Sequence, residues 1–320
     1  MRNLALTTTL ADVSPIAFGC MGLGGDKNSA TFSNSDRSLA RQCIEVALEE
    51  GINFFDHADI YCNGRAEQIF GDVLKEQPDL REQIYIQSKC GIYLRDDIGP
   101  QRYDLSYEHI IESVEGSLAR LQCDYLDILL LHRPDPLMEP EEIARAFRLL
   151  KEQGKVKHFG VSNMHAGQIS LLQEFIDEPL VVNQLELNLA HRDFIETAVT
   201  VNDCQGKNSY FNEGLLEYCQ RNKIQVQAWS PLAQGLFARE PRNAEIAAAQ
   251  ERLDAYALEY NGTRESILLA WLMRHPAGIQ PVIGTTHAKR IRACAKAADI
   301  ELTRLQWYLL LTDVRGHPIP

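Results

Sequence analysis

Short runs of apolar residues alternate along this chain with longer segments in which apolar residues recur every three or four positions. The short runs predict buried strands, and the longer periodic segments predict amphipathic helices. The alternation occurs eight times, which is typical of a parallel sheet whose strands are each followed by a helix. The predicted strands lie at residues 15–20, 84–88, 126–131, 159–161, 180–183, 225–228 and 280–283, and in the stretch that begins F-F-D at residue 54.

The predicted helices differ from the strands in both period and length. The segment 107–121 is the clearest, because its apolar residues all fall on one face of a helix. Further helices are predicted at residues 38–50, 66–74, 140–153, 165 or 166 to 175, 214–221, 244–260, 264–274, 288–298 and 303–312.

Two segments do not fit the repeat. Residues 4–13 are expected to form a short β-hairpin ahead of the first strand. Residues 187–212 are long for a connection and polar around 201–209, so we predict an irregular excursion over one face of the fold. The sequence leaves open whether this excursion is a functional lid or a simple insertion.

The repeat favours one fold, a single-domain (β/α)8 TIM barrel over residues 1–320 with an N-terminal β-hairpin and extra C-terminal helices. The alternative is a doubly wound open sheet that binds a dinucleotide. After the first strand the chain reads G-C-M-G-L-G-G from Gly19, which does not match G-x-G-x-x-G in register and does not open directly into a helix. We therefore reject the open sheet.

Composition and charge narrow the class of partner. The 320 residues are 45% hydrophobic and 24% charged, which is typical of a globular protein with enough apolar surface for a core. A formal net charge of -12 disfavours nucleic acid and anionic membranes and favours a small-molecule partner. The N-terminus lacks the apolar core of a signal peptide, and no run of about 18 apolar residues occurs, so we expect a cytoplasmic protein.

The cysteines do not form a recognisable metal or disulfide pattern. The chain has eight of them, without a C-x-x-C pair and without partner histidines at zinc-ligand spacing. We expect reduced thiols and predict no metal site. Cys20, Cys62 and Cys90 flank candidate site positions and are interpreted as small buried hydrophobic residues.

Polar residues stand at the ends of several predicted strands. In a barrel the carboxyl ends of all strands meet on one face, so residues far apart in the sequence converge there. Each has an ordinary explanation on its own: Lys89 as a solvated strand end, His132 as a structural histidine, and Gln184 as a packing residue. Their coincidence predicts a site, which comprises Asp56, Lys89, His132, Ser162, Asn163, Gln184 and Trp229, with Tyr61 on the loop after Asp56.

The residue types in this group suit the reduction of a carbonyl. A tyrosine has a pKa near 10 and is a poor acid at neutral pH unless a cation lowers it. Lys89 is the candidate cation for Tyr61, and Asp56 would keep the lysine charged. A histidine donor beside the tyrosine would help stabilise the oxyanion that forms as a carbonyl accepts hydride. Hydrolysis fits less well, because the sequence shows neither a nucleophile with an adjacent base nor a set of metal ligands.

Several short motifs occur in the order typical of one family. They are D-x-x-x-x-Y from Asp56, S-K from Ser88, L-H-R-P from Leu131, G-V-S-N from Gly160, N-Q from Asn183, A-W-S-P-L from Ala228 and I-G-T-T from Ile283. On these motifs the chain resembles an aldo-keto reductase over nearly its whole length. It looks closest to a bacterial subgroup of poorly characterised oxidoreductases.

The resemblance implies a catalytic tetrad of Asp56, Tyr61, Lys89 and His132 with Tyr61 as the proton donor, a bound NADP(H) and a monomer. Arg290 would meet the 2'-phosphate, which favours NADP over NAD. Two departures bear on this: Gly284 stands where several members carry a lysine, and Ala293 and Cys294 replace a polar pair. The implied cofactor contacts are Gly19, Met21, Ser162, Asn163, Gln184, Trp229, Ser230, Leu232, Gly235, Gly284, Thr285, Thr286 and Arg290.

The expected function is an NADPH-dependent oxidoreductase that reduces an aldehyde or a ketone to an alcohol. The alternative is an NADPH-binding regulatory or interaction subunit on the same fold with little turnover, since a fold does not fix a function. A weaker alternative is a barrel aldolase that uses Lys89 as a Schiff base.

Overall fold

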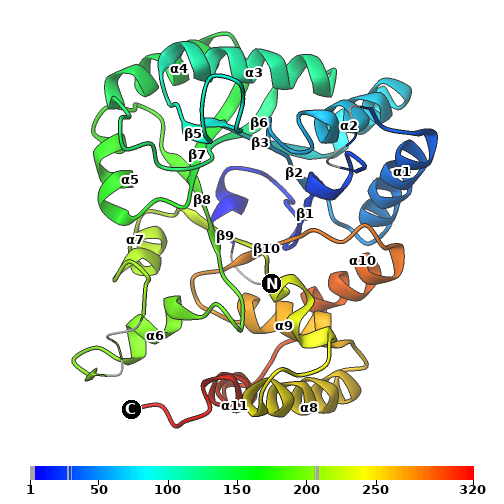
Figure 1. Cartoon of the computed structure of the whole chain (residues 1–320), viewed down its shortest axis with the longest axis vertical. Helices are drawn as coiled ribbons and strands as arrows, with labels where there is room; N and C mark the ends of the chain where they lie inside the picture. Colours follow the sequence, from blue (N-terminus) through cyan, green and yellow to red (C-terminus); the bar gives the residue numbers. More distant parts are fainter. Residues whose placement is uncertain (1–3, 27–28, 30, 205, 207–208) are drawn as a thin grey trace.

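The computed structural model describes residues 4–26, 29, 31–204, 206 and 209–320, and its centre is a closed barrel of parallel strands (Figure 1). Around the barrel the strands follow the order β1, β10, β9, β8, β7, β6, β3, β2. This confirms the predicted (β/α)8 barrel. The strands are β1 (Ala17–Gly19), β2 (Phe54–Asp56), β3 (Tyr85–Cys90), β6 (Leu126–Leu131), β7 (Val156–Ser162), β8 (Leu180–Glu186), β9 (Gln225–Trp229) and β10 (Gln280–Ile283).

Helices surround the barrel (Figure 1). Those that follow the barrel strands are α1 (Asn34–Glu49), α2 (Arg65–Glu76), α3 (Tyr107–Leu121), α4 (Pro140–Glu152), α5 (Ala166–Gln173), α7 (Leu215–Arg221), α9 (Arg264–Met273) and α10 (Ala288–Ala295). Local signals fix several of their starts: Ser33 caps α1 in a capping box with Asp36, and Ser106 caps α3. Pro140 opens α4, where a proline costs no hydrogen bond.

Three further helices are α6 (Asp193–Val199), α8 (Ala244–Glu259) and α11 (Arg304–Arg315), and the last two confirm the predicted extra C-terminal helices. Some predicted ends move: β7 starts at Val156 rather than at 159, and α11 continues to Arg315, where Gly316 ends it with φ +73°. The helix predicted to reach residue 298 stops at Ala295 and continues as a 3-10 turn (Lys296–Asp299).

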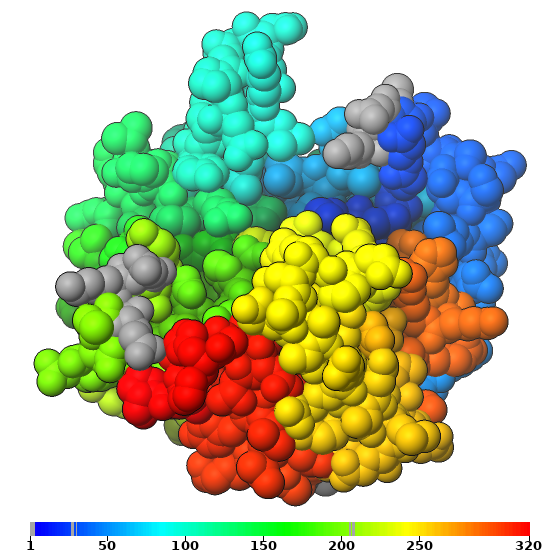
Figure 2. Space-filling view, turned by 60° about the horizontal axis from the view of Figure 1, so that its bottom comes forward, coloured from blue at the N-terminus to red at the C-terminus, as the bar shows by residue number. Residues whose placement is uncertain are grey.

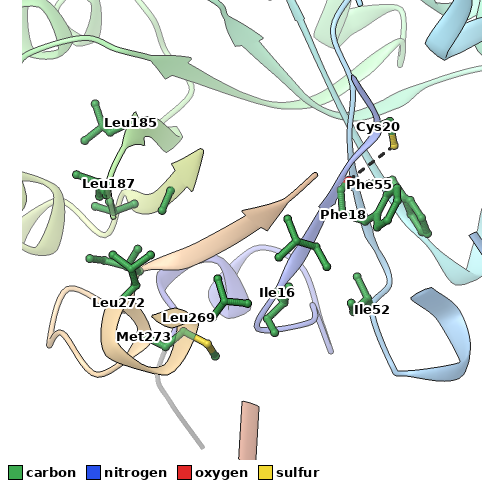
Figure 3. Close-up of a cluster of buried hydrophobic side chains, with 14 of the residues drawn as sticks. Ile16, Phe18, Cys20, Ile52, Phe55, Leu185, Leu187, Leu269, Leu272 and Met273 are labelled. Carbon is green, nitrogen blue, oxygen red and sulfur yellow. Dashed lines mark hydrogen bonds between the residues drawn. The ribbon is translucent and has the colours of Figure 1, made fainter. Parts of the chain in front are cut away.

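The hydrophobic core has two parts because successive strand residues face opposite sides of the barrel wall. Outward-facing residues such as Phe18 and Phe55 pack against the helices, with ring centroids 5.9 Å apart (Figure 3). Inward-facing residues such as Ala17, Phe54 and Ile128 form a second cluster inside the barrel. The same alternation carries Asp56 inward, two residues after Phe54, at the end of β2.

The N-terminal β-hairpin prediction is wrong. Residues 4–13 contain a 3-10 helix (Ala5–Thr8) and no strand, and their leucines pack into the inner cluster. The hydroxyls of Thr7 and Thr8 each donate to the carbonyl oxygen three residues earlier at 2.8 Å, which stabilises the tight turn. The amide of Leu6 also donates to Oε1 of Gln225 in β9 at 3.3 Å. This segment therefore closes one end of the barrel. A short antiparallel pair does occur elsewhere, as β4 (Ile92–Tyr93) and β5 (Arg102–Tyr103).

The predicted excursion at 187–212 is more ordered than expected, because it contains α6; its residues 205, 207 and 208 lie outside the described residues. Glu196 on α6 accepts hydrogen bonds from Arg192 at 2.9 Å and from Arg315 at 2.9 Å and 3.1 Å. The Arg315 side chain is only 1% exposed. A buried ion pair thus ties the excursion to the last turn of α11.

Helix α11 is held against the barrel by a reciprocal tryptophan pair. The rings of Trp271 on α9 and Trp307 on α11 stack at 5.1 Å with an angle of 6°. Each indole N–H donates to the other residue's carbonyl oxygen, at 3.1 Å and 3.0 Å. Figure 2 shows the C-terminal segment, in red, packed beside α8, in gold. In the part of the chain described here, no helix is long and apolar enough to cross a membrane.

Candidate active site

The predicted site residues meet at the carboxyl ends of the strands. Asp56, Ser162 and Trp229 are the last residues of β2, β7 and β9, and His132 directly follows β6. A cavity of about 750 Å³ opens there, within the usual range for small-molecule sites. Every predicted site residue except Lys89 lines this cavity, namely Asp56, Tyr61, His132, Gly19, Met21, Ser162, Asn163, Gln184, Trp229, Ser230, Leu232, Gly235, Gly284, Thr285, Thr286 and Arg290.

Lys89 lies directly beneath the cavity floor with its side chain fully buried. Its Nζ donates to Oδ2 of Asp56 at 2.8 Å, to the hydroxyl oxygen of Tyr61 at 2.9 Å and to the carbonyl oxygen of His57 at 2.9 Å. An ammonium group has three N–H donors, so all of them are used. Burial lowers the pKa of Lys89, but Asp56 and Tyr61 outweigh it and the net pKa is raised. Lys89 is therefore a fixed cation, and the neutral amine that a Schiff base requires is disfavoured.

Tyr61 is presented by a tight loop. Cys62, Asn63 and Gly64 follow it with φ of +50°, +55° and +81°, which turns the chain directly into α2. Burial raises the pKa of Tyr61 and Asp56 adds to the rise, whereas Lys89 acts in the opposite direction. The expected lowering by Lys89 is present, but the expectation of a lowered net pKa is wrong because burial outweighs it.

The imidazole of His132 completes the group around Tyr61. The two rings meet edge to face, with centroids 6.0 Å apart and an angle of 80°. Burial lowers the pKa of His132 well below its ordinary value, and the positive charges of Lys89 and Arg133 add to the effect. The ring is therefore neutral near pH 7 and carries one N–H donor.

A chain of hydrogen bonds fixes the polar side chains along one wall. The hydroxyl of Ser162 donates to the carbonyl oxygen of Gln184 at 2.9 Å, and Nδ2 of Asn163 donates to the Ser162 hydroxyl at 2.8 Å. Nε1 of Trp229 donates to Oδ1 of Asn163 at 3.1 Å. Asn163 holds a left-handed backbone with φ +59°, a conformation that asparagine tolerates better than most residues. The Trp229 ring is thereby held in one orientation at the cavity wall.

The other end of the cavity is formed after β9 and β10. Ser230, Ala233, Gln234 and Gly235 all have positive φ, between +49° and +78°, so the backbone curls around the cavity. A Cβ added to Gly284 would meet nothing within 4 Å, so the space beside this residue is open. Arg290 is exposed in the first turn of α10, and no acceptor for its guanidinium occurs among the residues described. Amides at one end and a free cation at the other match a nicotinamide dinucleotide phosphate.

Two kinds of site residue escaped the sequence analysis. Gln87 and Gln227 are buried beneath the cavity and bond to the predicted residues. Arg133 lines the cavity with its Cζ 5.9 Å from the Trp229 ring centroid, in cation–π range. Arg133 could have been predicted from the sequence, because it directly follows His132 at the end of a predicted strand. The remaining lining residues that were not predicted are Gly22, Pro231, Gln234, Phe237, Ala238, Arg239, Arg264, Glu265, Leu268, Val282 and His287.

A buried acidic cluster supports the Tyr61 loop from behind. Glu67 accepts from the Ser88 hydroxyl at 2.6 Å and from Nε of Arg120 at 2.8 Å. The amide of Asp59 donates to the carbonyl oxygen of Lys89 at 3.1 Å. Burial, followed by the charge of Glu67, raises the pKa of Asp59 to about 7. The loop is thus anchored to the same strand that supplies Lys89.

The thiol prediction can be checked within the described chain. All eight cysteines are free, and Cys20 and Cys90 are fully buried with pKa values raised by burial, as suits inert core residues. Across the described ranges no group of three or more histidine, cysteine or acidic residues is arranged to hold a metal ion.

Comparison with known proteins adds to this geometry. A model of the aldo/keto reductase family matches residues 15–310. The chain is 39% identical over 287 residues to the uncharacterized oxidoreductase YcsN of Bacillus subtilis (strain 168), covering 87% of this chain and 88% of that protein. It is 35% identical over 323 residues to a 6-dehydroglucose reductase of Agrobacterium fabrum (strain C58), covering 100% of both chains.

The fold is also found among solved structures. An aldo/keto reductase from Klebsiella pneumoniae, crystallised in complex with NADP and acetate, aligns with a TM-score of 0.73 at 24% identity. The alignment covers 96% of this chain and 93% of that one. At this level of identity the likeness supports the barrel architecture.

Proposed function

Because the chain belongs to the aldo/keto reductase family, we propose that it reduces an aldehyde or a ketone to the alcohol with NADPH, and that Tyr61 donates the proton. One observation carries the proposal. A single buried ammonium, Lys89 Nζ, lies 2.8 Å from the Asp56 carboxylate and 2.9 Å from the Tyr61 hydroxyl, beneath the floor of a cavity that Asp56, Tyr61 and His132 line.

The side chains act on the oxygen of the carbonyl. NADPH, when bound, supplies the hydride that adds to the carbonyl carbon. As negative charge develops on the oxygen, the Tyr61 hydroxyl gives up its proton to it and the neutral His132 ring donates a hydrogen bond. The tyrosinate that remains faces the Lys89 ammonium at 2.9 Å, and Asp56 keeps that ammonium charged. The raised pKa of Tyr61 holds it protonated at neutral pH, which is the state a proton donor needs.

The cavity wall offers a matching set of cofactor contacts. Ser162, Asn163 and Gln184 carry the hydroxyl and amide groups that suit the nicotinamide carboxamide, and the Trp229 ring would stack on the pyridine. Arg290 suits the 2'-phosphate, because a guanidinium pairs with a phosphate in a fork geometry. The remaining proposed contacts are Gly19 and Met21 at the floor, Ser230, Leu232 and Gly235 along the pyrophosphate, and Gly284, Thr285 and Thr286 near the phosphate end.

Two measurements test the proposal together. Isothermal titration calorimetry should detect NADPH binding, and oxidation of NADPH at 340 nm should accompany the reduction of aldehydes. The similarity to the Agrobacterium 6-dehydroglucose reductase makes sugar aldehydes the first substrates to try, followed by aromatic aldehydes and quinones. Absence of NADPH binding at millimolar concentration would remove the proposal, whereas binding without turnover of any carbonyl would favour the regulatory subunit instead.

A further inference from the structure

A closed ring of hydrogen bonds lies inside the barrel directly under the cavity. Nε2 of Gln87 donates to Oδ1 of Asp56 at 2.6 Å and to Oε1 of Gln227 at 2.9 Å. Nε2 of Gln184 donates to the same two oxygens, at 3.0 Å and 2.9 Å. The four residues are between 0% and 2% exposed. They come from four strands, so the ring spans the barrel between β2, β3, β8 and β9.

The orientation of every amide in this ring is determined by groups that only accept. An ionised carboxylate has no proton to give, so Gln87 and Gln184 must both turn their NH₂ groups toward Asp56. Gln227 must then present its oxygen to both, and its own NH₂ donates to Oε1 of Gln280 at 2.9 Å. Nε2 of Gln280 in turn donates to the carbonyl oxygen of Ser14 at 2.8 Å. The Asp56 carboxylate at one end of this chain of hydrogen bonds and the Ser14 carbonyl at the other can only accept. Both therefore require the same orientation of the amide groups between them.

This arrangement leaves one polar atom of Gln184 for the cavity. Both of its amide protons are used within the ring, and no donor among the described residues reaches its Oε1. Because Gln184 lines the cavity, its oxygen is the atom available to a ligand there. The wall at this point therefore accepts a hydrogen bond, and the complementary group on a ligand is an N–H.

We propose that Gln87 and Gln227 are positioning residues that hold the Asp56 carboxylate and the Gln184 amide as one unit, so that Gln184 selects a cofactor whose pyridine carries a carboxamide N–H. This inference rests on the proposed function. It predicts more than NADPH binding, because it ties the choice of pyridine substituent to residues that do not touch the ligand. Loss of Gln227 leaves Gln184 with Asp56 as its single partner, so its amide keeps only one of its two hydrogen bonds within the ring and can rotate about that bond.

The test compares NADP⁺ with its 3-acetylpyridine analogue, in which a methyl ketone replaces the carboxamide and removes the N–H. Calorimetry on the wild-type protein should give about tenfold weaker binding of the analogue, the effect of one buried acceptor left without a donor. In Gln227→Met this preference should shrink toward one, and kcat should fall. In Gln87→Met, which removes a partner of Asp56 and of Gln227 but none of Gln184, the loss of preference should be smaller. Equal binding of the two cofactors by the wild type would overturn the inference without any variant.

Gln225→Met is the matched control. Gln225 is also a buried glutamine of β9, but it donates to the carbonyl oxygens of Val226 and Gly278 and lies outside the ring. The control should keep the preference for the carboxamide even if its thermal unfolding midpoint falls. A Gln227→Met protein that folds and still prefers the carboxamide tenfold would contradict the inference. If the wild type binds neither cofactor, the proposed function fails instead, so the two failures are distinguishable.

Discussion

The ammonium of Lys89 lies 2.9 Å from the hydroxyl oxygen of Tyr61, and yet the pKa of Tyr61 is raised above its ordinary value. Burial disfavours the tyrosinate by more than the neighbouring cation favours it, and Asp56 adds to the same side. The resting tyrosine is therefore protonated over the whole neutral range. In the proposed reaction the lysine acts after proton transfer, when the new negative charge would otherwise stand alone in a buried site.

Replacing Tyr61 with phenylalanine should remove the proposed proton donor and little else. We expect Tyr61→Phe to lower the reduction rate by roughly 10² to 10⁴, the usual contribution of a positioned general acid, while NADPH binding by calorimetry stays unchanged. Tyr218→Phe is the control, since Tyr218 lies on α7 and bonds to Ser170 away from the cavity. Unchanged turnover in Tyr61→Phe would assign the proton to another group.

Removing the buried cation should cost stability as well as activity. In Lys89→Met the Asp56 carboxylate stays buried without its counter-charge, so we expect the free energy of unfolding to fall by about 3 to 5 kcal/mol. Guanidinium unfolding curves measure this. Lys155→Met is the control, because Lys155 pairs with a half-exposed Glu115 at the surface, and such pairs contribute roughly 1 kcal/mol or less. Similar losses in both variants would contradict the role given to burial.

Replacing Arg290 should distinguish the two nicotinamide cofactors. We expect Arg290→Gln to weaken NADPH binding by roughly 10- to 100-fold, the effect of losing a charge-assisted pair, and to leave NADH binding unchanged. Arg292→Gln on the same helix is the matched control, because Arg292 is already paired with Glu49 and Glu50. An equal effect of Arg290→Gln on both cofactors would place the 2'-phosphate elsewhere.

Acid should destabilise the protein partly through His57. Burial, followed by the charge of Lys89, lowers the pKa of His57 to about 3, and both ring nitrogens lack partners among the described residues. The unfolded chain takes up a proton near pH 6.5 that the folded chain refuses until about pH 3, so this stability is present above pH 6.5 and is lost as pH falls.

His57→Phe keeps a ring against Phe70 and removes the titration. Its unfolding free energy should therefore fall less steeply than that of the wild type between pH 7 and about pH 4.5. His317→Phe, at an exposed position, should keep the wild-type slope. Equal slopes for the wild type and His57→Phe in urea titrations would show that other groups carry the acid sensitivity.

Asp59 should have the opposite pH dependence. Its pKa is raised from 3.8 to about 7, so the folded state favours the protonated acid, and the stability it contributes is lost as pH rises from 3.8 to about 7. Asp59→Asn mimics the protonated acid and should exceed the wild type in unfolding free energy at pH 8. This advantage should shrink as the pH is lowered toward 4. An advantage that does not change with pH would contradict the raised pKa.

Sequence patterns located the helices and strands best in segments whose apolar residues followed either a strand pattern or a helical spacing throughout. The apolar run Leu126–Leu131, the one-faced segment Tyr107–Leu121 and the strand Gln280–Ile283 were predicted with their observed bounds. The N-terminal segment failed because threonine favours strands on average, whereas here the hydroxyls of Thr7 and Thr8 bond to backbone three residues back. Such local bonds leave no periodic signal.

The tetrad and the cavity residues were predicted because strand ends and family motifs mark them. The glutamine ring was missed, because Gln87 and Gln227 stand in strands that carry other polar residues as well. A lone glutamine in a strand has many possible partners, and only the barrel's closure brings β3 and β9 to the same point. The net pKa of Tyr61 was missed for a related reason, because burial depends on the whole fold and not on the neighbouring charges.

The stacked pair of Trp271 and Trp307 lies apart from the cavity, so the tryptophan fluorescence of the protein comes from two separate regions. The chain has three tryptophans, and the third, Trp229, lines the cavity 5.9 Å from the Arg133 guanidinium. Intrinsic emission therefore has one source beside the ligand and one where α11 meets the barrel. In Trp229→Phe the remaining spectrum would report only whether the C-terminal helix is seated, so detachment of α11 could be followed separately from occupancy of the cavity.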